Sequence, residues 1–365
     1  MAPKFVLIGG FLGAGKSTTV ARLAAHYSEK RKRVGIVTND QTTGLVDTQS
    51  LRHQGFDVGE VAGACFCCSF NELTDTVDQM QKGQLPDVIL AEPVGSCTDL
   101  VATVIRPLEN IYAQPLDIAP YGVVLKPSHG LRILTGKKKA GFSPKAAYIF
   151  RKQIEESDFV VINRIDELAQ EEVDSLAEAI ESEYPGRTIL RMSAKTGIGF
   201  DAYLEFLDQQ GQFGGRVIEV DYDLYAEGEA ELGWLNSQLK FASETEFSLD
   251  EILLRFVSEL QEQFKESEAE VAHLKVIGMS DGNYAVANSV STFTEPVLSL
   301  ASKCSTKRAD LVVNARVATE PSILEEAVVK RIQTLAGSLG ASVVTDTMQS
   351  FKPSPPVPTH RIAAS

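Results

Sequence analysis

The stretch Phe5-Val-Leu-Ile-Gly-Gly-Phe-Leu-Gly-Ala-Gly-Lys-Ser-Thr-Thr19 decides the fold of this chain. It opens with a short apolar run, residues 5–8, which is typical of a buried parallel strand. Residues 10–17 match the pattern of a phosphate-binding loop, and helical residues follow from Thr18. Because strand, glycine-rich turn and helix come in the order that this pattern requires, we predict a P-loop that binds a nucleoside triphosphate.

Each residue type in the loop has a physical reason. Gly10, Gly13 and Gly15 let the backbone bend tightly, with no side chain between its N–H groups and an anion. The positive end of the following helix points at the same place. Lys16 is expected to reach the β- and γ-phosphates, and the Ser17 hydroxyl to hold Mg²⁺. A chance glycine-rich turn is the alternative, but Lys-Ser in register behind a strand argues against it.

The length and composition of the chain limit the number of domains and the classes of partner that are expected. A chain of 365 residues is too long for one ordinary core, so two domains are expected. The net charge of −14 argues against a partner that is nucleic acid or an anionic membrane surface. No apolar run is long enough for a membrane span, and the N-terminus enters a core strand with no room for a signal peptide. We therefore expect a cytoplasmic protein.

Three of the five cysteines crowd into Cys65-Phe66-Cys67-Cys68. In a cytosolic chain this spacing favours metal or redox chemistry over a disulfide framework. Thiolates at these positions can converge on one soft cation if the backbone turns there, which Gly63 makes easy. Isolated cysteines are more often inert buried residues, and that remains the favoured interpretation of Cys97, although it could add a fourth sulfur.

Apolar runs that predict further strands of an α/β domain lie at 34–38, 56–61, 87–91, 121–125, 158–162 and 188–191. Ligands of doubly wound folds bind at the carboxyl ends of such strands. Asp40 and Asp47 follow the first of these runs and are candidates for a nucleotide-sensing loop. Glu92 follows the third, where a carboxylate approaches Mg²⁺ and the attacking water, and Gly95 can give a backbone N–H to the γ-phosphate.

The base is predicted from two short motifs at later strand ends. The carboxylate of Asp166 is an acceptor, so it can bind the ring N–H and the exocyclic amine of guanine, a pair of donors that adenine lacks. Asn163 would brace that loop, and a backbone N–H of Ser193-Ala194-Lys195 can meet the guanine carbonyl. In this order after a P-loop, the motifs indicate GTP rather than ATP.

Taken together these residues resemble the CobW-type GTPases, a branch of the P-loop GTPases that serves metalloenzyme and cofactor assembly. The resemblance covers residues 4–215 and rests on Gly10 to Ser17, Cys65-x-Cys67-Cys68, Glu92-x-x-Gly95, Asn163-x-x-Asp166 and Ser193-Ala194-Lys195. It departs from the family's usual pattern at Arg164, where Lys is common, and in the loops at Asp40 and Lys126. No His-rich tract follows in the C-terminal half.

The resemblance implies that Cys65, Cys67 and Cys68 bind Zn²⁺, Co²⁺ or a similar ion, that GTP with Mg²⁺ favours the metal-holding shape, and that hydrolysis to GDP releases the ion to a client protein. Lys16 and Glu92 are the predicted catalytic residues, and Ser17 also ligates Mg²⁺. The residues expected to contact nucleotide or Mg²⁺ are Gly10, Gly13, Ala14, Gly15, Lys16, Ser17, Thr18, Asp40, Gly95, Asn163, Asp166, Ser193, Ala194 and Lys195. A monomer or a nucleotide-dependent homodimer is expected.

The remaining chain predicts a second, smaller domain. We expect a P-loop GTPase domain with a mainly parallel, doubly wound sheet at 1–215, an α+β domain at 216–346 and a disordered Pro-rich tail at 347–365. Strand, helix, hairpin, strand, helix and strand follow one another in the second domain, with the hairpin turn at residues 280–283. This order suggests a ferredoxin-like sandwich for client contact or nucleotide-driven closure.

Two alternatives keep the nucleotide site but change the role of the thiols. One is a zinc sensor, whose nucleotide state reports metal supply without delivery. The other is a GTPase whose cysteines form a redox switch. A chaperone differs from both because its metal affinity must depend on the bound nucleotide and its metal must reach an apo-client.

Overall fold

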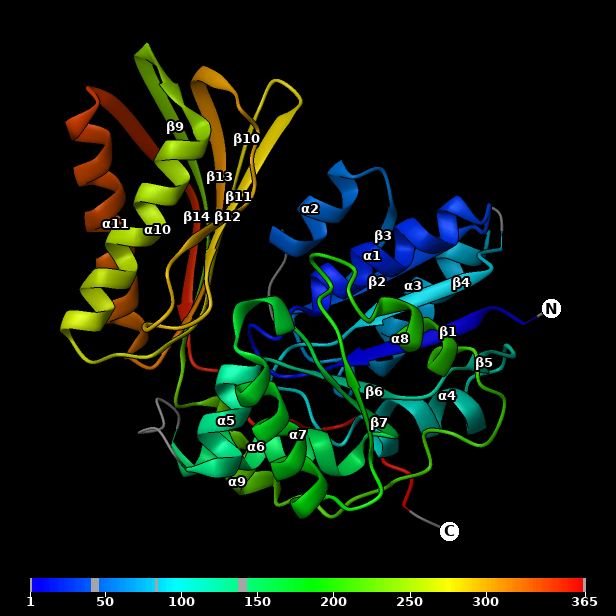
Figure 1. Ribbon diagram of the computed structural model, residues 1–365. Coiled ribbons are helices and arrows are strands. Elements are labelled where there is room, and N and C mark those ends of the chain that lie inside the picture. The colour runs from blue at the N-terminus through cyan, green and yellow to red at the C-terminus, as the bar shows by residue number, and fades with distance from the viewer. Residues whose placement is uncertain (1, 41–45, 83–84, 137–142, 364–365) are drawn as a thin grey trace. The chain divides into compact units, whose positions relative to one another are not determined.

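The computed structural model describes residues 2–40, 46–82, 85–136 and 143–363 (Figure 1). These residues form two compact units. The first contains the described residues up to 40, those from 55 to 228, and the C-terminal segment from Pro355. The second contains helix α2 (Val46–His53) and residues 229–354. The division near residue 228 lies after the boundary expected at 215.

The first unit is an α/β domain whose strands and helices alternate along the chain. Its elements are β1 (Lys4–Gly9), α1 (Lys16–Glu29), β2 (Val34–Asp40), β3 (Asp57–Ala62), α3 (Phe70–Lys82), β4 (Val88–Glu92), the π-helix Val101–Ile105, α4 (Arg106–Asn110), β5 (Asp117–Ile118), β6 (Gly122–Leu125), α5 (Pro127–Thr135), α6 (Pro144–Glu156), β7 (Phe159–Ile162), the 3₁₀ turn Ile165–Glu167, α7 (Gln170–Glu183), β8 (Thr188–Arg191), α8 (Phe200–Leu207) and α9 (Tyr222–Glu229).

Within the described residues the central sheet has the order β3-β2-β4-β1-β6-β7-β8, with β5 paired to β1, and every pairing is parallel. Buried apolar side chains fill β1, β4, β6 and β7, which explains why these strands read as continuous hydrophobic runs. The predicted doubly wound, mainly parallel sheet is confirmed. Its carboxyl edge gathers the loops that follow β1, β2, β4, β7 and β8.

The second unit is an antiparallel sheet with two long helices. Its elements, besides α2, are β9 (Gly233–Ser248), α10 (Leu249–Glu266), β10 (Val271–Ser280), β11 (Asn283–Ser289), β12 (Val297–Leu300), β13 (Ser305–Val317), α11 (Pro321–Ser338) and β14 (Ala341–Phe351). In the part of the chain that the structure describes, the strand order is β12-β11-β10-β13-β9-β14. Strands β14, β9, β13 and β10 give the ferredoxin-like order, and β11 with β12 extends the sheet at one edge.

Helices α10 and α11 lie side by side on one face of this sheet (Figure 1). Apolar residues of α10 recur at helical spacing and are buried against it, among them Leu253, Phe256 and Leu260. The Ser248 hydroxyl caps the helix by accepting a hydrogen bond from the backbone N–H of Glu251. The sheet's other face carries a small cluster, in which Val46 of α2 packs against Ile277 and Val312. None of the helices in the described residues is both long and apolar enough to cross a membrane.

The C-terminal segment differs from the disordered tail expected at 347–365. Residues 347–351 complete β14, which pairs with β9, and residues 355–362 run along the first unit with several hydrogen bonds. This ordered conformation could not be predicted from the composition, because prolines lack backbone donors and the segment has no hydrophobic periodicity. Its contacts are all made with residues far away in sequence.

Candidate functional site

The loop between β1 and α1 has the backbone geometry of an anion cradle. Gly10, Gly13 and Gly15 all adopt positive φ angles, of 135°, 72° and 94°. A Cβ atom on Gly10 would lie 2.2 Å from the carbonyl oxygen of Val124, so this position excludes a side chain as well as favouring glycine's backbone angle. Helix α1 starts directly afterwards, with Lys16 buried at its first turn. The N-terminus of α1 therefore faces the loop.

Asn163 joins this loop to the end of β8. Its side-chain amide donates to the carbonyl oxygen of Ala14 over 2.8 Å, and its Oδ1 accepts from the backbone N–H of Ala194 over 2.9 Å. A Cβ on Gly15 would lie 2.4 Å from the Asn163 amide nitrogen, so glycine is required for this approach as well. One buried side chain thus joins three motifs, since Asn163 lies 149 positions from Ala14 and 31 positions from Ala194.

Two arginines extend the same edge. Arg164 adopts a positive φ of 60°, and its guanidinium donates to the carbonyl oxygen of Gly13 over 3.2 Å while pairing with Glu167. Arg22 of α1 donates to the carbonyl oxygens of Ala194 and Lys195. Asp166 lies between these contacts on the 3₁₀ turn, where its side chain is exposed. The arrangement leaves the Asp166 carboxylate open to a ligand.

Ser17 and Glu92 meet at the other side of the P-loop. The Ser17 hydroxyl donates to Glu92 Oε1 over 2.9 Å, and Glu92 is 8% exposed at the end of β4. A hydroxyl and a carboxylate are oxygen ligands of the kind that Mg²⁺ prefers, so the donor set fits this ion. Gly95 follows in the next loop, where a Cβ would lie 2.9 Å from the backbone nitrogen of Leu12. Its backbone therefore approaches the P-loop as closely as a glycine allows.

The thiols of Cys65, Cys67 and Cys68 form a cluster in which all sulfur atoms lie within 4.8 Å of one another. A tight turn creates it, because the backbone N–H groups of Cys68 and Ser69 both donate to the carbonyl oxygen of Cys65 over 2.9 Å. Cys65 and Cys67 are buried and Cys68 is partly exposed. Three convergent sulfurs with one open side fit a soft divalent cation such as Zn²⁺.

The thiols also influence each other's protonation. Hydrogen bonds from the thiols of Cys67, Cys68 and Cys97 lower the pKa of Cys65. The same hydrogen bond to Cys65, together with burial, raises the pKa of Cys67 and raises that of Cys68 to about 11. Among the described residues neither Cys97 nor Asp40 belongs to the metal-competent group, although Cys97 contacts it through Cys65. Metal binding must therefore displace protons from Cys67 and Cys68.

Asn39, near the end of β2, holds the cysteine turn in place. Its amide nitrogen donates to the carbonyl oxygens of Val61 (3.0 Å) and Ala64 (2.8 Å), and its Oδ1 accepts from the backbone N–H of Phe66 over 2.8 Å. The side chain is 6% exposed, so these bonds replace water that it cannot reach. Sequence reasoning missed this role, although a polar residue ending an apolar strand was a visible signal.

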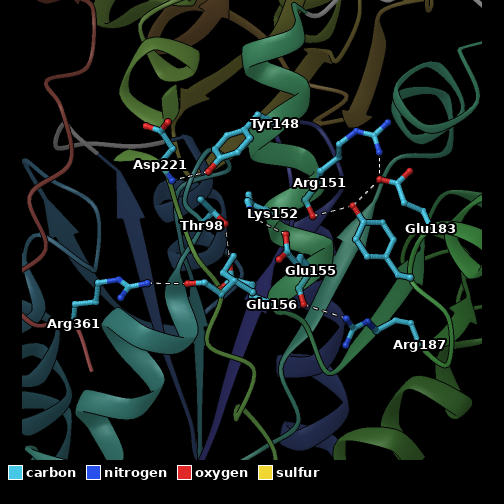
Figure 2. Close-up of polar contacts among 12 residues, drawn as sticks. Thr98, Tyr148, Arg151, Lys152, Glu155, Glu156, Glu183, Arg187, Asp221 and Arg361 are labelled. Carbon is cyan, nitrogen blue, oxygen red and sulfur yellow. Dashed lines mark hydrogen bonds and ion pairs between the residues drawn. The ribbon is translucent and has the colours of Figure 1, made fainter. Parts of the chain in front are cut away.

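Two buried polar residues of α6 hold the loop that carries Gly95 and Cys97. Gln153 donates to the carbonyl oxygens of both, over 3.0 and 2.8 Å. Glu156 accepts from the Thr98 hydroxyl and from the backbone N–H of Val101, each over 3.1 Å, and Figure 2 shows Glu156 facing Thr98. Burial raises the pKa of Glu156 to about 8. Neither residue belongs to a recognisable motif, so their support of this loop could not be predicted from the sequence.

The remaining predicted residues lie where the sequence placed them along the chain. Thr18 is exposed on the first turn of α1, and Asp40 is half-buried at the end of β2. Ser193 is buried, and its hydroxyl accepts from the backbone N–H of Thr196. Asp47, the second candidate of a nucleotide-sensing loop, belongs instead to α2, where it forms an ion pair with Lys275 of β10.

Comparison with known proteins identifies the family of this chain. The family model described as the CobW/HypB/UreG nucleotide-binding domain matches residues 4–191, just over half of the chain. The chain belongs to this family. The match ends at β8, so it covers the P-loop, the cysteine cluster and the loops after β4 and β7, whereas residues 229–354 of the antiparallel unit lie outside it.

Individual proteins are similar to parts of this chain or to its fold. The zinc chaperone YeiR of Escherichia coli K12 is 29% identical over 177 residues, which is 47% of this chain and 49% of YeiR. The chain thus matches about half the length of this curated relative. Two solved structures are similar at lower identity. The hydrogenase maturation factor HypB from Archaeoglobus fulgidus (19% identity, TM-score 0.39) spans 56% of this chain and 88% of its own. The Zn(II)-bound YjiA GTPase of E. coli (14% identity, TM-score 0.38) spans 92% and 99%.

The Asn39 contacts predict that Asn39→Ala destabilises the protein by about 1–3 kcal/mol, because it leaves a buried N–H and two carbonyl oxygens without their partner. The matched control is Asn110→Ala, which removes an exposed amide that donates to the carbonyl oxygen of Arg106. Urea unfolding of both variants measures the difference. Equal free energies of unfolding for the two would show that Asn39 does not hold the turn.

The raised pKa of Glu156 predicts a specific pH dependence. Between its ordinary value of 4.5 and about 8, the folded protein keeps a proton that the unfolded chain releases. The contribution of Glu156 to stability is therefore complete below pH 4.5 and falls by about 1.4 kcal/mol for each unit of rising pH until about 8. Glu156→Gln should lack this component, whereas Glu155→Gln, at a partly exposed neighbour, should follow the wild type. Parallel pH profiles of the unfolding free energy for wild type and Glu156→Gln would contradict the assignment.

Proposed function

We propose that this protein is a GTP-binding and GTP-hydrolysing metallochaperone that binds Zn²⁺ or Co²⁺ through Cys65, Cys67 and Cys68 and delivers the ion to a client protein. The observation that carries the proposal is the cluster of three sulfur atoms that lie within 4.8 Å of one another. Asn39 holds the turn that forms this cluster, and it lies at the same carboxyl edge of the sheet as the P-loop. The family membership and the zinc-chaperone relative support it.

Guanine recognition rests on the edge formed by β7 and β8. The exposed Asp166 carboxylate accepts from the ring N–H and the exocyclic amine, and Asn163 fixes the loop that carries it against the P-loop and Ala194. Arg164 donates from its guanidinium to the P-loop carbonyl oxygen of Gly13. Guanine is thus selected by the Asp166 carboxylate, and Asn163 holds the loop that carries this carboxylate in place.

Hydrolysis relies on positioning and on electrostatic stabilisation. Lys16 and the backbone N–H groups of the glycine loop bind the phosphates, and the close approach of Gly95 adds a donor at the γ-phosphate side. Ser17 supplies a hydroxyl ligand for Mg²⁺, which when bound neutralises charge between the β- and γ-phosphates. Glu92, beside Ser17, orients the attacking water or the hydrated ion.

The metal is the cargo in this scheme. Cys67 and Cys68 release their protons when the ion binds, and Cys65 is the sulfur best prepared to bind first because its thiolate is stabilised by its neighbours. Hydrolysis releases the γ-phosphate, and we infer that Asn39, near the carboxyl end of β2, passes the resulting change to the cysteine turn. The ion is then released to the client.

Removing the guanine acceptor tests the choice of base. Asp166→Ala should weaken GTP binding about 100-fold, because two charge-assisted hydrogen bonds are lost, and should leave the weak binding of ATP unchanged. The matched control is Asp201→Ala, at an exposed carboxylate of α8. Competition of both nucleotides against a fluorescent analogue provides the measurement. An equal loss for GTP and ATP would refute the assignment of guanine recognition to Asp166.

Removing one sulfur tests the metal site. Cys67→Ala should lower Zn²⁺ affinity by about 100-fold or more, because two thiolates do not make a structural zinc site. Cys304→Ala removes a partly exposed cysteine of the second unit and should bind Zn²⁺ like the wild type. Titration against a chromophoric chelator measures both. Unchanged affinity in Cys67→Ala would remove the proposed site, and reversible oxidation of metal-free thiols without any Zn²⁺ binding would favour the redox switch.

A further inference from the structure

The C-terminal segment Pro355–Ile362 runs directly over the cysteine turn. The backbone N–H of Thr359 donates to the carbonyl oxygen of Cys67, and the Thr359 hydroxyl to that of Cys68, each over 2.8 Å. The backbone N–H of Val357 donates to the sulfur of Cys68 over 3.2 Å. The segment therefore contacts the sulfur of Cys68, the partly exposed member of the thiol cluster.

The sequence of this segment makes the contact with sulfur specific. In Pro355-Pro356-Val357-Pro358 the prolines have no backbone N–H, so Val357 supplies the only donor of the four residues. That single donor is directed at Cys68, while the Val357 side chain is 75% exposed and makes no buried contact of its own. The prolines also restrict the free chain to extended conformations, which lowers the entropy lost when the segment is held in place.

Contacts beyond Thr359 fasten the segment to the first unit. His360 packs edge-on against Phe70, the first residue of the helix that follows the cysteine turn, with 5.3 Å between ring centroids. Arg361, which is labelled in Figure 2, pairs with Asp99 over 2.7 Å and donates to the carbonyl oxygen of Ile218. The backbone N–H of Ile362 donates to the carbonyl oxygen of Ala102.

The carboxylate of Asp99, which accepts from Arg361, is also held by a contact within the first unit. Asp99 is 1% exposed and also accepts from the Tyr222 hydroxyl over 2.7 Å. Detachment of Arg361 would leave the buried Asp99 carboxylate without its charged partner, which is unfavourable. The segment is therefore held by this ion pair as well as by exposed backbone contacts. The ion pair between Arg361 and Asp99 anchors the C-terminal part of the segment to the first unit.

We propose that residues 355–362 form a metal-retaining strap, in which the Val357 N–H supports the Cys68 sulfur as a ligand and the strap's backbone covers the open side of the cluster. An N–H donor to a coordinating thiolate stabilises its charge and fixes its direction, as other groups hydrogen-bonded to metal ligands do. Transfer of the ion to a client requires the strap to lift. This inference rests on the proposed function and assigns residues outside the family's matched region to the metal site.

Two substitutions of Val357 separate the effect of its backbone N–H from the effect of its side chain. Val357→Pro removes the N–H within a run of prolines that already favours the same backbone, and Val357→Ala keeps the N–H and changes only an exposed side chain. For Zn²⁺-loaded protein mixed with excess chelator, Val357→Pro should release the ion about tenfold faster than wild type. Val357→Ala should behave as wild type. Equal release rates for the two variants would overturn the role of the N–H.

The cover itself is tested without metal. In the metal-free protein, alkylation of Cys68, followed site by site through mass spectrometry, should become about tenfold faster in a chain ending at Ser354 and in full-length Arg361→Ala. A chain ending at Ile362 keeps the strap and should label like the wild type. Unchanged Cys68 labelling in both strap variants would refute the strap. Absence of Zn²⁺ binding by the wild type would instead refute the proposed function, so the two failures are distinguishable.

Discussion

The buried amide of Asn39 is the contact on which the site depends most. It uses both its donor and its acceptor to hold the turn that gathers the three thiols, and it extends from β2, one of the strands whose carboxyl edge carries the P-loop. Because interiors are packed at nearly crystalline density, a displacement of the Asn39 side chain cannot be absorbed locally and must move the cysteine turn that it holds. The proposed coupling between nucleotide state and thiol geometry therefore runs through this side chain.

Much of this arrangement could be predicted from sequence because parallel strands place their carboxyl ends at one edge. The motifs at Lys16, Glu92, Asp166 and Cys67 each follow a parallel strand, so finding the strands was enough to bring them together. The supporting contacts could not be predicted in the same way. Asn163 and Glu156 act through pairings between distant elements, and no local pattern reports a hydrogen bond across the sheet.

The second unit shows the same division between local and distant information. Helical and strand periodicity predicted its ferredoxin-like order, and burial in α10 and the central strands explains why. The place of Asp47 in the chain predicts a nucleotide-sensing loop, yet Asp47 lies on α2 and pairs with Lys275, and the backbone N–H of Val46 donates to buried Asn314 of β13. The C-terminal segment escaped prediction for a related reason, since its order comes wholly from the surface on which it lies.

The central claim is that nucleotide occupancy controls the affinity of the three thiols for their ion. The most direct measurement is the Zn²⁺ dissociation constant of the wild-type protein, determined by chelator competition with a non-hydrolysable GTP analogue and again with GDP, both with Mg²⁺. The account predicts Zn²⁺ binding at least about fivefold tighter in the triphosphate state, with reciprocal tightening of the GTP analogue by Zn²⁺. Equal Zn²⁺ affinity in the two nucleotide states would contradict it.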